Sequence, residues 1–406
     1  MPNGPVRRDL VLLVSSRVLG GLALQMTSVA LGWLVYARTG SAYALSLLGL
    51  FQFLPMIPLV AVTGHAADQY DRRKVAAASM AAQAAGAAAL FGFAGSSLSM
   101  AWLYALALLL GSARAFMMPA QRALLPTLVA PEELSRAVAL TSSSSQLALM
   151  VGPALGGVVY AVAGPATFLA AAALLALAVA LSLMIGRPAP RPPAEREGVW
   201  TRAFAGLVYL RSNPVLLGAI TLDLFAVLLG GVTSLLPIFA RDILHAGPEG
   251  LGLLQSGPAI GAVLVGFGLA RFQIRRRAGL VLLAAVAGYG LATILFGVSR
   301  NFALSLACMI ALGGFDMVSV VIRQTLEQVN TPDEMRGRVG AVSSVFVAGS
   351  NRLGDFESGM VAGLVGAPAA AVVGGLGSIL VVIGAAVFAR SLRDADSLDL
   401  PSAKPA

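Results

Sequence analysis

The residues best suited to chemistry are charged side chains that lie inside long apolar runs. Arg17, Arg114, Asp223 and Asp316 each interrupt such a run. A charge at the centre of a bilayer costs about 2.5–3.5 kcal/mol on insertion scales, so each side chain needs a partner or a wet cavity. An acid in such a place can take up and release a proton, because desolvation favours its neutral form. A guanidinium group there can bind an anion; the alternative for Arg17 and Arg114 is that the long side chain extends to the cytoplasmic membrane interface.

Two further clusters of charged residues lie downstream of Asp316. In the first cluster, Arg323 and Glu327 are four residues apart, a spacing at which their charges can neutralise each other. Arg352 and Asp355 share a helix face, whereas Glu357 is turned by about 160° from Asp355. This last cluster is either an internal Arg–Asp pair with Glu357 near the outer end of its helix, or a wet, ligand-facing surface. The second interpretation is slightly favoured.

The runs that carry these charges are long enough to be membrane-spanning helices. The chain of 406 residues is 58% hydrophobic and 12% charged with a mean hydropathy of +0.84, against about 25% charged in soluble domains. A spanning helix needs about 20 mostly apolar residues. The sequence therefore predicts an all-α membrane protein of twelve helices, near 10–36, 44–64, 75–95, 99–119, 137–162, 165–186, 213–239, 250–271, 279–298, 301–326, 338–364 and 367–390.

The placement of positive charge predicts the orientation. The net charge is +9, yet most of the 28 Lys and Arg residues fall in one set of loops and at the chain ends, while the opposite loops hold only Arg38, Arg241 and Arg300. By the positive-inside rule, both termini are cytoplasmic. This distribution argues for a membrane topology and against nucleic-acid binding. Arg7 and Arg8 precede a run too long and too polar for a signal peptide, so it is read as a retained first helix.

Metal and disulfide chemistry find little support in the sequence. Cys308 is the single cysteine, and the two histidines, His65 and His245, are expected on opposite faces of the membrane. There is no nucleotide-binding Gly-x-x-x-x-Gly-Lys-Ser/Thr motif. The sequence therefore predicts neither an enzyme nor built-in ATP drive.

A polar interruption in mid-chain divides the sequence into two halves. Residues 187–203 are rich in Pro, Arg and Glu and are read as a cytoplasmic linker between residues 1–186 and 204–406. Each half carries six of the predicted helices. Arg17, Arg114, Asp223 and Asp316 fall on the first, fourth, seventh and tenth helices, which correspond under a three-helix repeat. The first half contributes bases and the second half contributes acids.

A dense charge cluster lies between the second and third predicted helices. It contains Gly64, Asp68, Arg72, Arg73 and Lys74. One interpretation is topogenic charge alone. The other is a charge relay across a helix junction, in which Gly64 permits a tight turn and Asp68 ends a helix.

A second backbone feature lies in the fifth predicted helix. Gly152-Pro153-Ala154-Leu155-Gly156-Gly157 combines one proline with three glycines. Such a string can bend a helix or let a neighbouring helix approach closely. The earlier segment from Pro119 to Pro126 is read as the cytoplasmic exit of the fourth helix.

These two motifs resemble those of the major facilitator superfamily. The charged loop is similar to the Gly-x-x-x-Asp-x-x-x-Arg-Arg/Lys-Lys signature, with Asp71 where the family usually has a second glycine. The resemblance implies two six-helix bundles related by pseudo-two-fold symmetry, with Asp68 latching one conformation. The Gly-Pro-x-x-Gly-Gly string resembles the antiporter motif found mainly in exporters. It therefore implies efflux.

A further set of residues is similar to the enterobactin-exporter branch of the drug:proton antiporters. This set is Pro119-Ala120, 123–126, 204–210, Asn213-Pro214, Gln324, Thr325, Pro332, Arg336, Gly337, Arg338 and Val339. The resemblance implies export of a small amphipathic compound, a siderophore or a drug, by proton antiport with alternating access. It implies a bacterial-type cytoplasmic membrane, a monomer, and the proton gradient in place of a cofactor. A proton-coupled uptake symporter or facilitator is the alternative, followed by a receptor that does not transport.

The predicted roles follow from depth and charge. Asp316 is the first choice for proton coupling, followed by Asp223 and Asp355. Arg17, Arg114, Arg352 and Glu357 are expected to bind substrate. The residues expected to gate the conformational change are Gly64, Asp68, Arg72, Arg73, Lys74, Gly152, Pro153, Gly156 and Gly157.

The charged loop lies at the membrane surface, too far from a central site to select a substrate. We therefore expect Asp68→Asn to slow transport while leaving substrate preference intact. Initial rates for several substrates in reconstituted vesicles check this division of roles. A changed substrate profile at normal turnover would contradict it.

Overall fold

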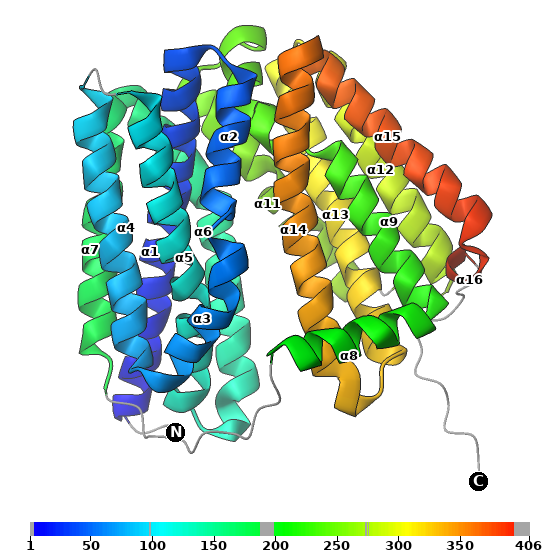
Figure 1. Cartoon of the computed structure of the whole chain (residues 1–406), viewed down its shortest axis with the longest axis horizontal. Helices are drawn as coiled ribbons and strands as arrows, with labels where there is room; N and C mark the ends of the chain where they lie inside the picture. Colours follow the sequence, from blue (N-terminus) through cyan, green and yellow to red (C-terminus); the bar gives the residue numbers. More distant parts are fainter. Residues whose placement is uncertain (1–3, 97–98, 187–198, 273, 275, 394–406) are drawn as a thin grey trace. The chain divides into compact units, whose positions relative to one another are not determined.

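The computed structural model describes residues 4–96, 99–186, 199–272, 274 and 276–393. Within these ranges the chain is built from helices joined by short turns, as predicted for an all-α membrane protein (Figure 1). Contacts divide the chain into two compact units. Unit 1 comprises Met1–Glu195 and Ala240–Ser256, and unit 2 comprises Arg196–Phe239 and Gly257–Ala406. Ala240–Ser256 therefore belongs to unit 1 by its contacts, although it follows the predicted linker in sequence.

Seven long helices and two short 3₁₀ turns make up most of unit 1. They are α1 (Gly4–Thr39), α2 (Ala42–Phe53), α3 (Met56–Gln69), α4 (Arg72–Ala94), α5 (Met100–Leu128), η1 (Pro131–Glu133), α6 (Leu134–Ala163), η2 (Gly164–Ala166) and α7 (Thr167–Met184). Helix α1 packs on α6 and α7, and α4 packs on α5 and α7. The core between α1, α4, α5 and α7 is made of alanines with Met26, Met80 and Met117. Such small and flexible side chains let these helices lie close together.

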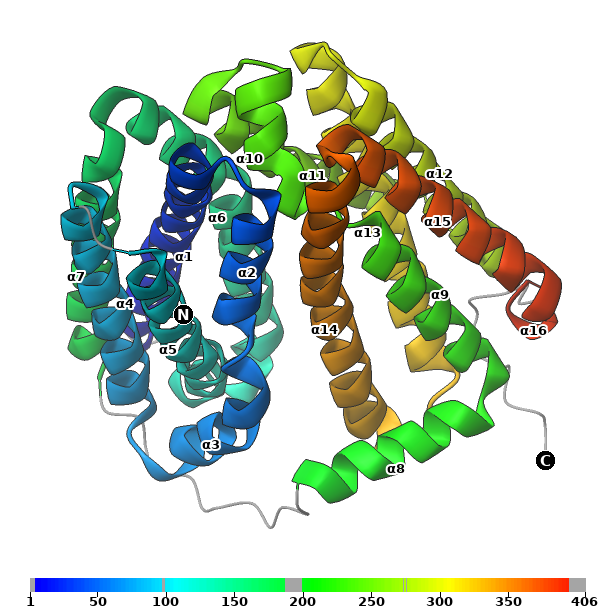
Figure 2. The ribbon, with the colours of Figure 1, turned by 45° about the horizontal axis from the view of Figure 1, so that its top comes forward.

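Unit 2 begins with a helix that crosses the ends of others. Figure 2 shows α8 lying across the ends of α9 and α14. The elements that follow α7 along the chain are α8 (Val199–Ser212), α9 (Pro214–Gly230), η3 (Thr233–Leu235), α10 (Leu236–Ile238), the π-helical turn η4 (Phe239–Ile243), α11 (Gly247–Arg271), α12 (Ala278–Val298), α13 (Phe302–Val329), α14 (Asp333–Val365), α15 (Ala367–Phe388) and α16 (Arg390–Arg393). Helix α12 packs on α13 and α15, and α9 packs on α14 and α15.

Ten stretches of the described chain are long and apolar enough to cross a membrane. One of them, Pro131–Met184, contains both α6 and α7. Helix α14 is 33 residues long but is not among the ten, because its polar residues lower its hydropathy. The multi-pass membrane fold is thus confirmed, whereas the count of twelve spans stays a prediction.

Several predicted boundaries are wrong. Gly64 does not form a tight turn but lies inside α3, and the chain breaks instead at Tyr70–Asp71. The second predicted helix is divided into α2 and α3 at Leu54–Pro55, since proline removes a backbone donor. Helix α5 does not end near Pro119 but continues through Pro126 to Leu128. Prolines are tolerated in membrane helices because neighbouring groups satisfy the freed carbonyls.

The predicted linker is also shorter than expected at its C-terminal end. Residues 199–203 form the first turns of α8, while 187–198 lie outside the described residues. The Asn213 side chain accepts hydrogen bonds from the backbone N–H groups of Val215 and Leu216, which caps the start of α9. The polar composition of the linker was therefore a poor guide to where helix formation resumes.

Candidate functional site

A buried ion pair lies at the centre of unit 2. Asp223 is on α9 and Arg323 is on α13, and the Oδ2 and Nη1 atoms are 2.7 Å apart. Only 5% of the Asp223 side chain and 9% of the Arg323 side chain are exposed. Arg323 Nε also donates to Ser319 Oγ at 3.2 Å. Removing one partner of such a pair leaves an uncompensated buried charge, so the two residues fix each other in place.

The expected self-neutralising pair of Arg323 and Glu327 is therefore wrong. The Arg323 guanidinium turns across to Asp223 instead of along its own helix. Glu327 accepts a hydrogen bond from the Ser343 side chain of α14 and interacts with Arg323 only at longer range. Asp223 prevails because it is buried among apolar side chains and has the greater need of a counter-charge.

Asp316 lies about two turns before Arg323 on α13 and faces the same polar region. It interacts electrostatically with Asp223 and Arg323. Its side chain is exposed at the surface of unit 2, and within the described chain it makes no ion pair or hydrogen bond. Tyr289 on α12 lies near both acids, and its hydroxyl donates to the Gly230 carbonyl at 3.3 Å.

The cluster on α14 joins this region from a third helix. Arg352 Nη1 lies 3.8 Å from Asp355 Oδ2, and the arginine side chain is 40% exposed. The Asp355 carboxylate also accepts a hydrogen bond from the Ser234 backbone N–H. The Arg–Asp pair is present but loose, whereas a wet, ligand-facing surface stays a prediction. Glu357 contacts the hydroxyl of its neighbour Ser358 at 3.4 Å and lies apart from this pair.

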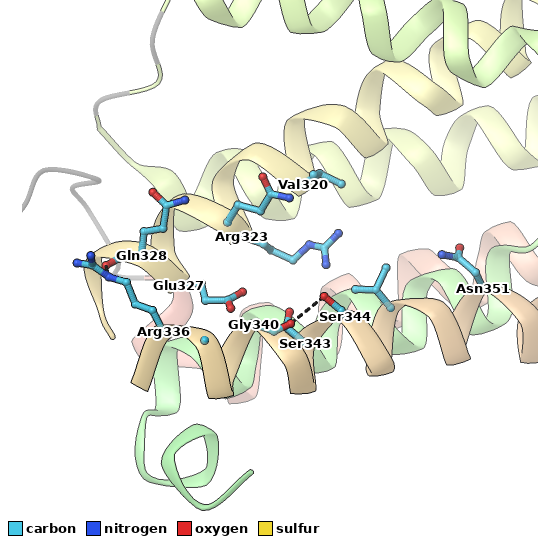
Figure 3. Close-up of a pocket in the computed structure, with 12 residues that line it drawn as sticks. Val320, Arg323, Glu327, Gln328, Arg336, Gly340, Ser343, Ser344 and Asn351 are labelled. Atoms are coloured by element: carbon cyan, nitrogen blue, oxygen red, sulfur yellow. Dashed lines mark hydrogen bonds between the residues drawn. The ribbon is translucent and has the colours of Figure 1, made fainter. Parts of the chain in front are cut away.

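A pocket of about 820 Å³ opens between α13 and α14, next to the buried ion pair (Figure 3). Arg323 belongs to its wall and thereby connects the pocket to Asp223. Its lining consists of Val320, Arg323, Gln324, Glu327, Gln328, Arg336, Gly337, Gly340, Ser343, Ser344, Val347 and Asn351. The volume falls within the roughly 300–1,000 Å³ of small-molecule sites, so the pocket can hold a drug-sized ligand.

The charges in this region do not balance. Arg323 interacts with three carboxylates, those of Asp223, Asp316 and Glu327. One positive charge thus serves three acids in a partly desolvated environment. Such an arrangement favours the uptake of protons or of a cationic group, because each removes excess negative charge. This is the chemistry that the site can perform.

Sequence reasoning missed most of the pocket wall. The hydroxyl and amide groups of Ser343, Gln328 and Asn351 had been given no role. A signal for them exists: Arg336, Gly340, Ser343, Val347 and Asn351 are spaced three or four residues apart, and so are the lining residues of α13. Two polar stripes at helical spacing in otherwise apolar helices indicate two faces turned to one wet space.

Two of the three arginines expected to bind substrate, Arg17 and Arg114, lie in unit 1. Arg17 on α1 donates from Nε to Gln121 Oε1 of α5 at 3.4 Å. Arg114 is also on α5, is half-buried and has an interaction partner. These arginines and the acids belong to different units, and the binding role of the arginines stays a prediction.

The charged loop has a different geometry from the expected turn. Asp71 is the N-cap of α4, with φ −58°, and its side chain accepts from the Arg73 backbone N–H at 3.0 Å. Arg73 Nη2 lies 2.7 Å from Asp71 Oδ2, and this hydrogen-bonded ion pair holds the pKa of Asp71 below its usual range. Aspartate replaces the usual glycine here because no left-handed backbone is needed. Arg72 donates to the Ala123 carbonyl of α5 at 3.0 Å.

The remaining loop residues are placed by backbone alone. Asp68 lies in the last turn of α3, and its side chain is outside the described part. Lys74 is exposed in the first turn of α4. The gating role of these residues is therefore still a prediction.

The Gly-Pro-x-x-Gly-Gly string lies at two close helix contacts. A Cβ added at Gly152 would come within 2.7 Å of Gln25 Cβ, and one at Gly156 within 2.6 Å of Met26 Cα, both on α1. On its other face, Gly157 meets the first turn of α11 at Pro248 and Gly252. The Ala154 N–H donates to Ser256 Oγ at 3.1 Å. The string thus acts by close packing, as predicted for one of its two interpretations.

Comparison with known proteins agrees with this architecture. The family model described as "Transmembrane secretion effector" matches residues 4–406. The chain belongs to this family of the major facilitator superfamily. Membership places it among membrane transporters of small molecules rather than among enzymes.

Individual relatives share this class. The chain is 27% identical to the enterobactin exporter EntS of Citrobacter koseri over 91% of its own length and 86% of the relative. It is 28% identical to EntS of Shigella boydii, covering 80% of its own length and 74% of the relative. The fold matches a bacterial homologue of the lysosomal transporter Spinster with a TM-score of 0.72 at 15% identity, covering 97% of each chain. It matches the nucleoside transporter NupG with a TM-score of 0.67 at 15% identity, covering 95% of this chain and 98% of that one.

The buried ion pair makes a prediction about stability. Arg323→Gln should lower the free energy of unfolding by about 3–5 kcal/mol, because Asp223 is left buried without a counter-charge. The double variant Asp223→Asn/Arg323→Gln should recover much of this loss. Unfolding in mixed micelles with increasing dodecyl sulfate measures these values. Arg352→Gln is the control, since its accessible pair should contribute less than about 1 kcal/mol; equal losses for Arg323→Gln and Arg352→Gln would disprove the difference.

The packing of the glycine string makes a second prediction. Gly156→Ala should lower the free energy of unfolding by about 1–3 kcal/mol, because the added Cβ meets the α1 backbone. The matched control is Gly92→Ala on α4, where an added Cβ has no atom within 4 Å. The same unfolding assay applies. If both alanine variants behave alike, the close contact at Gly156 is not what limits this position.

Proposed function

We propose that this transporter exports a small amphipathic compound, a siderophore or a drug-like molecule, by proton-coupled antiport with alternating access. The observation that carries the proposal is the excess of acid around Arg323, in a protein of the transmembrane secretion effector family. An exchange of protons against substrate needs a group that changes charge in a desolvated place. Asp223 and Asp355 are largely buried, and Asp316 lies midway along the apolar helix α13 with an exposed side chain.

Asp316 is the coupling acid in this proposal. Asp223 is held by Arg323 at 2.7 Å and Asp355 by Arg352 and the Ser234 N–H, whereas Asp316 has no hydrogen bond or ion pair within the described residues. Its proton can therefore leave without breaking an ion pair first. Asp223 is the second acid, because a change at Asp316 acts on the same arginine.

The direction of transport rests on two separate supports. The relatives of known name are enterobactin exporters, and the Gly-Pro-x-x-Gly-Gly string is intact in α6. Enterobactin is therefore one substrate to test for this chain, beside basic drug-like compounds. In this proposal the chain lies in the bacterial cytoplasmic membrane with both termini in the cytoplasm, as the distribution of basic residues favours.

The proposal predicts the behaviour of Asp316→Asn. In inverted membrane vesicles with an acidic interior, the wild type should accumulate substrate, whereas Asp316→Asn should fall to the level seen without a gradient. The variant should keep substrate counterflow exchange, which needs no proton. Glu132→Gln, at an exposed position in η1, serves as the control and should behave as wild type.

Two results would contradict the proposal. Full gradient-driven accumulation by Asp316→Asn would remove its coupling role. Accumulation only when the gradient is reversed would favour an uptake symporter instead. A receptor that does not transport would show binding without flux under either gradient.

A further inference from the structure

The pocket between α13 and α14 has three ionisable side chains in its wall, and two of them are already neutralised or engaged. Arg323 is paired with the buried carboxylate of Asp223. Arg336 Nε donates to the backbone carbonyls of Gln328 and Thr331, both at 3.2 Å. These bonds tie Arg336 to the C-terminal end of α13, where carbonyls lack helical partners. The third group, Glu327, is the one carboxylate of the described wall, and no basic side chain lies at ion-pair distance from it among the described residues.

The Glu327 carboxylate is held in the gap between the two helices. Figure 3 shows Arg323 and Glu327 projecting from α13 toward α14. A Cβ added at Gly340 of α14 would lie 3.2 Å from Glu327 Oε1, so the carboxylate lies directly against that helix. Its hydrogen-bond partner is the Ser343 side chain, and within the described residues it forms no ion pair.

A half-buried carboxylate with one hydroxyl partner is incompletely compensated. A hydroxyl supplies one hydrogen bond but no counter-charge. The nearby guanidinium of Arg323 cannot supply both Asp223 and Glu327, because it faces Asp223 at 2.7 Å. A ligand that brings its own positive charge would complete the site, and charge-assisted hydrogen bonds are the strongest that it could form there.

We propose that the pocket between α13 and α14 binds the protonated amine of a small amphipathic molecule, with Glu327 as its anchor. The amide groups of Gln324 and Asn351 offer further hydrogen bonds, and Val320 and Val347 offer apolar contact. This inference rests on the proposed function and names the substrate class for it: a basic, drug-like compound. It assigns recognition to a residue for which the sequence had indicated only a self-neutralising pair.

The ion pair next to the pocket has a part in this recognition. Arg323 and Glu327 are four residues apart on α13 and can pair as soon as Asp223 no longer competes. Asp223 thus keeps the arginine away from Glu327. Removing the Asp223 charge should turn Arg323 toward Glu327 and weaken binding of an amine, although Asp223 does not line the pocket.

A pair of matched probes tests the proposal. Monodansylcadaverine carries a primary amine, and its N-acetyl derivative has the same dansyl group without the charge. Equilibrium dialysis against the full chain in lipid nanodiscs, corrected with empty discs, gives the two dissociation constants. We expect the wild type to bind the amine at least about tenfold more tightly, equivalent to about 1.4 kcal/mol.

Three variants decide the outcome. Glu327→Gln should abolish the preference for the amine, Asp223→Asn should reduce it, and Glu334→Gln, at an exposed position outside the pocket, should keep it. The proposal is overturned if the wild type shows no preference, or if Glu327→Gln keeps it. Binding of the N-acetyl derivative with the wild-type dissociation constant shows that Glu327→Gln and Asp223→Asn are folded; an unchanged preference in Asp223→Asn also counts against the proposal.

Failure of this inference is distinguishable from failure of the proposed function. The dialysis needs no proton gradient and no transport. Amine binding that depends on Glu327 without flux in vesicles would uphold the site and remove the antiport. Proton-driven export without amine preference would uphold the antiport and remove the site.

Discussion

Charge buried among apolar helices needs a counter-charge, and this constraint organises unit 2. Asp223 and Arg323 come from α9 and α13, so their contact requires that the two helices lie close. Glycines make such distances possible. Gly231, at the end of α9, contacts Gly354 of α14, and Gly313 of α13 contacts Pro258 of α11. In lipid the apolar side chains themselves give helices little reason to associate, so small residues and polar pairs hold the unit together.

The same arginine connects the acids functionally. Asp223, Asp316 and Glu327 all act on Arg323, and only one of them can hold it at ion-pair distance. In the proposed mechanism, a proton on Asp316 and a cation at Glu327 are two ways of removing the same excess negative charge. Once the proton or the cation has bound, less electrostatic free energy is gained by binding the other. Competition of this kind is what antiport requires, and it needs no contact between the proton and the substrate.

The helices could largely be predicted from sequence, because apolar length and composition determine which segments enter a membrane. The exceptions are local. Gly64, Pro119 and Pro126 are residues that usually end helices, yet each lies inside one here. Their conformation depends on neighbouring helices that satisfy the backbone, and a single sequence does not reveal those neighbours.

The individual residues of the site could be predicted from the sequence, but their pairing across helices could not. The depth of Asp223, Asp316 and Asp355 in apolar runs marks them as functional, but helical periodicity relates residues of one helix and not of two. Sequence spacing therefore paired Arg323 with Glu327 on the same helix, whereas the structure pairs it with Asp223 on another. The pocket wall was missed for the same reason. It needs the stripes of α13 and α14 to face each other.

Helix α11 shows how one element serves both units. Its first turns, up to Ser256, pack on the glycine string of α6, and its remainder belongs to unit 2 from Gly257 onward. Pro258 follows directly and has no N–H to donate to the Leu254 carbonyl. Bending at this point therefore breaks fewer backbone hydrogen bonds than bending elsewhere in the helix. Ser256 Oγ holds the N-terminal side of this position to α6 by the hydrogen bond that it accepts from the Ala154 N–H.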